Sequence, residues 1–107
     1  MMRRVLIAES DDDVRDLLEL TVRRLGYEAV AADGTNVDAM LVEPASAVGR
    51  SVLQRFGADA PPVICLSIYP REDGLEPAAS VAYLVKPASS TEIADALRTV
   101  FGVQPEQ

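Results

Sequence analysis

Six polar residues that could do chemistry follow directly after short apolar runs in this sequence. They supply three carboxylates, two hydroxyls and one ammonium group: Glu9, Ser10, Asp11, Glu43, Ser67 and Lys86. Carboxylates can bind a divalent cation for phosphate chemistry, and an ammonium can neutralise a phosphoryl group. If the apolar runs are parallel strands, these groups meet at the carboxyl edge of the sheet, where such folds carry their sites. Polar residues also occur at this edge as helix caps and loop residues, so a single one is weak evidence of a functional site. The whole set, in this order along the chain, is stronger evidence.

The composition narrows the classes of function. The chain has 107 residues and a net charge of −7, from 10 basic and 17 acidic side chains, which argues against a nucleic-acid partner. It has no His, so imidazole catalysis and histidine-ligated metals are excluded. Its apolar runs fall far short of the ~20 residues of a membrane span, and Cys65 is the only cysteine. We therefore expect one cytoplasmic domain over residues 1–103, with 104–107 as a C-terminal tail, that contacts neither nucleic acid nor membrane.

The elements that must position these residues can be predicted from hydrophobic periodicity. Short apolar runs predict strands over residues 3–8, 27–32, 39–42, 63–66 and 82–85. Apolar residues at helical spacing predict helices over 14–25, 47–56 and 93–101. Asp11 to Asp13 suit the start of the first helix, and Ser89 and Glu92 have capping-box spacing before the last. Residues 69–80 contain two prolines and a glycine, so one or two helical turns at most fit there.

Alternating strands and helices predict a three-layer α/β/α fold around a five-stranded parallel sheet. The connection between the second and third strands is unusual, because about six residues separate them. A parallel crossover normally needs a dozen or more residues. Either the helix between these strands is deleted, or residues 37–43 form a short helix instead of a strand.

In this order and spacing, the segments resemble a response-regulator receiver domain of the CheY-like superfamily, over residues 3 to about 102. Residues 5–11 resemble the first strand and its acidic pair, and 25–28 and 32–34 match the segments around the second strand. Residues 62–67 resemble the fourth strand with its hydroxyl residue, and 83–87 resemble the fifth strand with its lysine. The resemblance implies a flavodoxin-like sheet order. It also implies that the helix between strands two and three is deleted and that the fourth helix is shortened.

The resemblance assigns roles to individual positions, and two of them depart from the family pattern. Glu43 stands at the phosphoacceptor position, where the family has an aspartate, and its carboxylate reaches ~1.5 Å further, enough to disturb a positioned reaction. Ser10 stands where the family has a carboxylate that ligates Mg²⁺, and a hydroxyl is a poor ligand for that ion. We therefore expect no bound metal or other cofactor, with Glu9 and Asp11 as the vestigial metal candidates. By resemblance, the remaining switch and pocket positions are a strand-end hydroxyl residue, the switch aromatic, the lysine after the fifth strand and a proline that a cis bond usually precedes: Ser67, Tyr83, Lys86 and Pro87.

Our leading interpretation is a degenerate receiver (a pseudo-receiver) that acts in two-component phosphorelay signalling by protein contact. It would not be an enzyme and would not be phosphorylated in the usual way. Its partner would be a sensor kinase, a downstream signalling protein or a second copy of the chain. The sequence fits a stand-alone domain, and a fragment of a longer protein is the alternative. Glu43 either supplies a permanent negative charge beside Lys86 that imitates a phosphoryl group, or marks the simple loss of the phosphorylation site.

Two other functions are compatible with the sequence. The first is a working receiver that accepts a phosphoryl group at Glu43 or a neighbour, with Glu9 and Asp11 holding Mg²⁺. The second is a small Mg²⁺-dependent phosphate-ester hydrolase, which the lack of histidine and the sparse acids at the strand ends disfavour.

Overall fold

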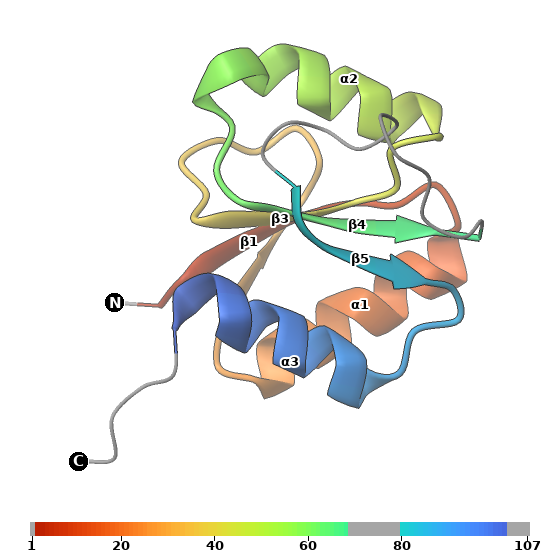
Figure 1. Cartoon of the computed structure of the whole chain (residues 1–107), viewed down its shortest axis with the longest axis vertical. Helices are drawn as coiled ribbons and strands as arrows, with labels where there is room; N and C mark the ends of the chain where they lie inside the picture. The colour runs from red at the N-terminus through yellow and green to blue at the C-terminus, as the bar shows by residue number, and fades with distance from the viewer. Residues whose placement is uncertain (1, 69–79, 103–107) are drawn as a thin grey trace.

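The computed structural model describes residues 2–68 and 80–102 of the chain. Within them, the main elements follow one another in this order: β1 Arg4–Ala8, α1 Asp12–Arg24, β2 Glu28–Val30, β3 Ala39–Val42, α2 Ala47–Phe56, β4 Val63–Ser67, β5 Ser80–Val85 and α3 Ser90–Phe101. The strands form one parallel sheet in the order β2-β1-β3-β4-β5. Figure 1 shows α2 on one face of this sheet and α1 and α3 on the other. The predicted three-layer α/β/α fold with a five-stranded parallel sheet is confirmed.

The central strands β1, β3 and β4 bury both of their faces, which is why they are continuous apolar runs in the sequence. Successive side chains of a strand point to opposite faces, so the buried residues separate into two cores. Val5, Ile7 and Leu41 face α1 and α3. Leu6 and Met40 face α2. The sheet is thereby packed on both faces, and this packing holds the residues at its carboxyl edge in place.

The connection between β2 and β3 contains turns and no helix over residues 31–38, all of which are described. The predicted deletion of a helix is therefore confirmed. The alternative of a short helix over 37–43 is wrong, because Ala39–Val42 pairs in parallel with β1 on one side and β4 on the other. Pairing on both sides outweighs the weak helical tendency of so short a segment.

Two arginines hold this short crossover against the rest of the domain. The Arg4 guanidinium donates to the carbonyl oxygens of residues 35 and 36, at 2.6 and 2.7 Å. The Arg55 guanidinium, on α2, donates to the carbonyl oxygens of residues 32 and 34, the latter at 2.9 Å. These contacts satisfy carbonyl groups that a helix would satisfy internally. The connection is therefore short but well anchored.

The largest differences from the predicted strand boundaries are in β2 and β5, whereas β1 and β4 differ by one residue each. β2 covers residues 28–30 instead of 27–32, because only those residues pair with β1. β5 begins at Ser80 instead of residue 82, because its pairing with β4 starts opposite Val63. The helical turns expected within 69–79, and with them the shortened fourth helix, lie outside the described residues, as does the tail at 104–107.

The helix ends follow the sequence signals. The Asp11 side chain accepts a hydrogen bond from the Val14 amide and caps α1. Ser89 and Glu92 form the expected capping box at the start of α3, with each side chain accepting from the backbone amide of the other. No helix in the described parts of the chain is both long enough and apolar enough to cross a membrane.

Candidate functional site

The carboxyl edge of the sheet collects the polar residues singled out in the sequence. Glu9 follows β1, Glu43 follows β3, Ser67 ends β4 and Lys86 follows β5. These strands are neighbours in the sheet, in the order β1-β3-β4-β5. Parallel strands end at a common edge, so residues that are far apart in the sequence come together here.

Lys86 lies between two carboxylates and contacts both. Its Nζ atom is 2.7 Å from Glu9 Oε1 and 2.7 Å from Glu43 Oε2. The three side chains are mostly shielded from solvent, with exposed fractions of 14% for Lys86, 1% for Glu9 and 17% for Glu43. One ammonium therefore neutralises part of a largely buried acidic pair.

Ser10 completes the environment of Glu43. The Ser10 hydroxyl donates to Glu43 Oε1 at 2.6 Å, and the Ser10 backbone amide points to the same oxygen at 3.2 Å. Glu43 thus has one oxygen held by Lys86 and the other by Ser10. The Asp11 amide donates to Glu9 Oε2 at 3.1 Å, so both oxygens of Glu9 are also engaged.

These contacts set the charge states of the cluster. Burial raises the pKa of the Glu43 carboxyl, but the hydrogen bonds from Lys86 and Ser10 outweigh it and lower the pKa from 4.5 to about 2. Burial lowers the pKa of Lys86, but its hydrogen bonds to Glu43 and Glu9 more than compensate, so the pKa is raised. At neutral pH Glu43 is therefore a stabilised carboxylate, which is a weak base and a weak nucleophile.

The backbone of Glu43 is fixed by the turn that follows it. The Ser46 hydroxyl donates to the Glu43 carbonyl oxygen at 2.8 Å and accepts from the Gly49 amide at 2.9 Å. A Cβ atom added at Gly49 would lie 1.8 Å from that carbonyl oxygen, so a side chain does not fit here. Sequence reasoning missed both residues. The available signal was a serine cap followed by a glycine at a helical position that disfavours it.

Known structures share this fold, although no known protein-family profile matches the chain. A two-component response regulator from Clostridium difficile is similar with a TM-score of 0.79 at 13% identity, covering 98% of this chain and 100% of that one. A chemotaxis response regulator from Vibrio cholerae has a TM-score of 0.79 at 18% identity, covering 94% and 99%. The receiver domain of a sensor histidine kinase from Pseudomonas aeruginosa, with a magnesium ion coordinated in its active-site cleft, has a TM-score of 0.67 at 21% identity, covering 95% and 99%. The chain has the fold of a response-regulator receiver domain.

The other positions assigned by the receiver resemblance lie around the cluster. Ser67 is 6% exposed, and its carbonyl oxygen accepts from the Lys86 amide at 2.7 Å. Tyr83 is half-buried and packs against the core on the α2 side of the sheet. Pro87 follows a cis peptide bond after Lys86, as the resemblance implied. The structure thus brings Glu9, Ser10, Glu43 and Lys86 into direct contact, whereas the switch roles of Ser67 and Tyr83 stay predictions.

The side chains that a magnesium ion would need at this edge of the sheet are engaged in contacts within the protein. Glu9 and Glu43 both hold Lys86, and Ser10 contributes a hydroxyl whose hydrogen is directed to Glu43. The Asp11 side chain accepts from the Val14 amide in the first turn of α1. Within the described residues, no group of three or more acidic, cysteine or histidine side chains could hold a metal ion.

An apolar groove of about 310 Å³ adjoins the cluster and shares Lys86 with it. The groove lies among α1, the end of β4 and the segment between β5 and α3, with Leu17, Ile68 and Pro87 among its lining residues. Leu17 is 57% exposed and Ile68 is 63% exposed. Large apolar side chains that are this exposed beside one another mark a candidate contact surface.

Proposed function

We propose that this protein is an atypical response-regulator receiver that signals by protein–protein contact and is not phosphorylated in the usual way. The observation that carries the proposal is the engagement of both Glu43 carboxylate oxygens, one by Lys86 at 2.7 Å and one by Ser10 at 2.6 Å. A phosphoacceptor must present a carboxylate oxygen to the incoming phosphorus atom. Here both oxygens already serve internal contacts.

The charges around Glu43 support the same proposal. Phosphoryl transfer depends on cations that neutralise the charge developing on the transferred group. Lys86 is the cation in this cluster, and it is already shared between two carboxylates. The pKa of Glu43 near 2 further lowers its nucleophilicity. We infer that internal contacts occupy the charged groups of this site, so that its role is structural or signalling and it catalyses no phosphoryl transfer.

The partner that suits this protein presents an apolar side chain on a basic surface. Leu17 and Ile68 supply the apolar contact. Asp13 lies one turn before Leu17 on the exposed side of α1, and Asp16 adjoins it. A sensor kinase or a downstream signalling protein with a basic amphipathic helix would match both features.

A phosphorylation assay tests the central part of the proposal. The protein is incubated with Mg²⁺ and acetyl phosphate, and covalent addition of a phosphoryl group is followed by intact-mass spectrometry. We expect no adduct on the natural sequence, and an adduct on a Ser10→Asp/Glu43→Asp variant that restores the family residues. An adduct on the natural protein that disappears in Glu43→Gln would establish the working-receiver alternative instead.

A binding assay tests the partner surface. Partner capture from a cell extract should be lost with Leu17→Asp and Ile68→Asp and retained with Leu20→Asp, because Leu20 is exposed on α1 but does not line the groove. Sedimentation at several protein concentrations shows whether the partner is a second copy. Glu43→Gln distinguishes the two interpretations of Glu43, since loss of binding supports a permanent signalling charge. Equal capture by all variants would contradict the groove as the contact surface.

A further inference from the structure

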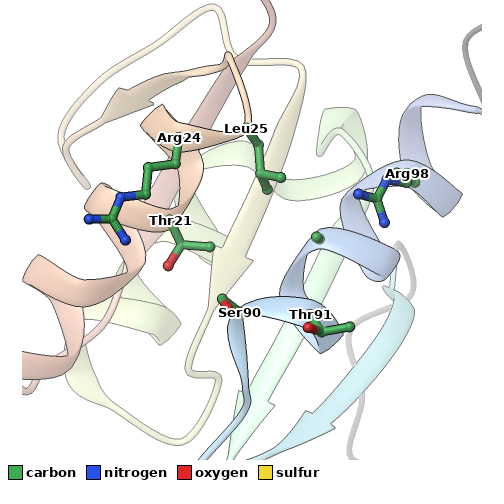
Figure 2. A pocket seen from close by; sticks show the side chains of 7 residues that line it. Thr21, Arg24, Leu25, Ser90, Thr91 and Arg98 are labelled. Carbon is green, nitrogen blue, oxygen red and sulfur yellow. The ribbon is translucent and has the colours of Figure 1, made fainter.

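A second cavity lies between α1 and α3, away from the acidic cluster, and has a volume of about 260 Å³ (Figure 2). Its α1 side is lined by Thr21, Arg24 and Leu25, and its α3 side by Ser90, Thr91 and Arg98. Figure 2 shows the two arginines on opposite sides of this cavity, with the two α3 hydroxyl residues between them at its edge. The lining is therefore cationic and rich in hydroxyl groups, in a chain whose net charge is −7.

The hydrogen-bond donors of this cavity are not all committed. Arg24 has no ion pair within residues 2–68 and 80–102. Arg98 pairs with Asp95 at 2.9 Å, and both side chains are more than half exposed, so this pair is weak. The Thr21 hydroxyl already donates to the Leu17 carbonyl oxygen and offers only an acceptor. The available donors are therefore the two guanidinium groups and the hydroxyls of Ser90 and Thr91.

The acids near the cavity oppose anion binding only in part. Glu92 is occupied by the capping box, where its carboxylate accepts from the Ser89 amide. Asp95 is the carboxylate that competes directly for Arg98. On α1, Glu19 lies near Arg23, which is not part of the lining. The lining itself thus contains two arginines and no acidic residue, although the whole molecule is acidic.

We infer that this cavity binds the phosphate group of a small molecule, either inorganic phosphate or a phosphate monoester. Guanidinium groups match phosphate oxygens with paired N–H donors, and serine and threonine hydroxyls add neutral donors. The volume lies just below the usual range for whole small-molecule ligands, about 300–1,000 Å³, and suits an anionic head group. The inference is independent of the acidic cluster at the carboxyl edge and of the function proposed for it.

Amide NMR titration of the intact chain with inorganic phosphate tests the inference, at low ionic strength and with chloride as the ionic-strength control. We expect saturable shifts at Ser90, Thr91 and Arg98 with a dissociation constant of about 1–10 mM, as for a few exposed charge-assisted contacts. Parallel titrations with adenosine monophosphate and with succinate identify the chemistry that is recognised. Binding of the monophosphate at similar strength supports a ligand that carries phosphate as its head group. Succinate should bind at least about tenfold more weakly.

Three variants separate specific binding from a general charge effect. Arg98→Gln should weaken phosphate binding about tenfold, because one charge-assisted contact is lost. Asp95→Asn should strengthen binding, because it frees Arg98 from its competing partner. The matched control Arg23→Gln removes a neighbouring charge outside the lining and should leave the affinity unchanged. Linear shifts equal to those with chloride, equal binding of succinate, or equal losses in Arg98→Gln and Arg23→Gln would each overturn the inference.

Discussion

Replacing Lys86 by methionine removes the positive charge that lies between Glu9 and Glu43. Methionine has nearly the length of the lysine stem, so the packing around the chain changes little. The two carboxylates, each 2.7 Å from the lost nitrogen, would then face one another across at most twice that distance. The perturbation therefore creates a largely buried like-charge pair.

The magnitude can be bounded in two ways. Two unit charges about 5 Å apart repel by about 3 kcal/mol at an effective dielectric constant near 20. The loss in free energy of unfolding also has an upper limit, because one of the two carboxylates can escape the repulsion by taking up a proton. Protonating a glutamate of ordinary pKa, about 4.3, costs about 3.7 kcal/mol at pH 7. We therefore expect Lys86→Met to lower the free energy of unfolding by about 3–4 kcal/mol at pH 7. Since the folded variant then binds one more proton than the unfolded chain, this loss shrinks by up to about 1.4 kcal/mol per pH unit on acidification toward pH 5.

Urea unfolding of the natural protein and the variant, at pH 7 and pH 5, measures both quantities. Arg15→Met is the matched control, because Arg15 forms a solvent-exposed pair with Asp12 and its loss should change stability by less than about 1 kcal/mol. A Glu9→Gln/Lys86→Met double variant should lose the pH dependence, since only one ionised carboxylate is left. A loss below about 1 kcal/mol at pH 7, or a loss that does not vary with pH, would refute this account of the cluster.

Three further predictions follow from contacts elsewhere in the structure. Gly49→Ala should destabilise the domain by about 3 kcal/mol in urea unfolding, because its Cβ meets the Glu43 carbonyl oxygen at 1.8 Å; an unchanged midpoint would be inconsistent with that approach. Glu43→Gln should be most destabilising above pH 4.5, because the contacts that lower the pKa of Glu43 stabilise the folded protein only while this carboxyl is ionised. The difference in stability from the natural protein should shrink by roughly 1–2 kcal/mol as the pH falls toward 2. Stability curves of the two proteins that run parallel with pH would contradict the lowered pKa. Arg55→Gln should speed amide hydrogen exchange over residues 31–38 and lower the free energy of unfolding by about 1–2 kcal/mol. The control Arg50→Gln removes an exposed contact to the nearby residue 45 and should leave exchange in that loop slow. Equal exchange rates in the two variants would argue against the anchoring role of Arg55.

The sheet and its helices could be predicted because local and tertiary preferences agree. The run from Val5 to Ala8 is apolar at every position, as a strand buried on both faces requires. The stripe through Val14, Leu18 and Val22 is helical and packs on the sheet. β2 was overestimated because apolar residues continue past Val30, whereas its pairing with β1 does not.

The sequence predicted which residues form the site, but it did not predict the contacts between them. Functional residues lie at the carboxyl ends of parallel strands, and from this rule the sequence alone predicts that Glu9, Glu43 and Lys86 lie close together. It could not show that Ser10, which the resemblance identifies only as a missing metal ligand, donates to Glu43. Nor could it show that Gly49 is required by a backbone approach, since that depends on how α2 docks behind β3.

One measurement tests the central claim, that the acidic cluster is satisfied internally and no longer takes up a metal ion and a phosphoryl group. It is an amide NMR titration with Mg²⁺, followed by beryllofluoride as a mimic of the phosphoryl group, on the natural chain and on Ser10→Asp/Glu43→Asp. We predict that the resonances of Glu9, Glu43 and Lys86 stay unmoved in the natural chain at millimolar reagent and shift saturably in the variant. Saturable shifts in the natural chain that spread from these residues to Ser67 and Tyr83 would contradict the account.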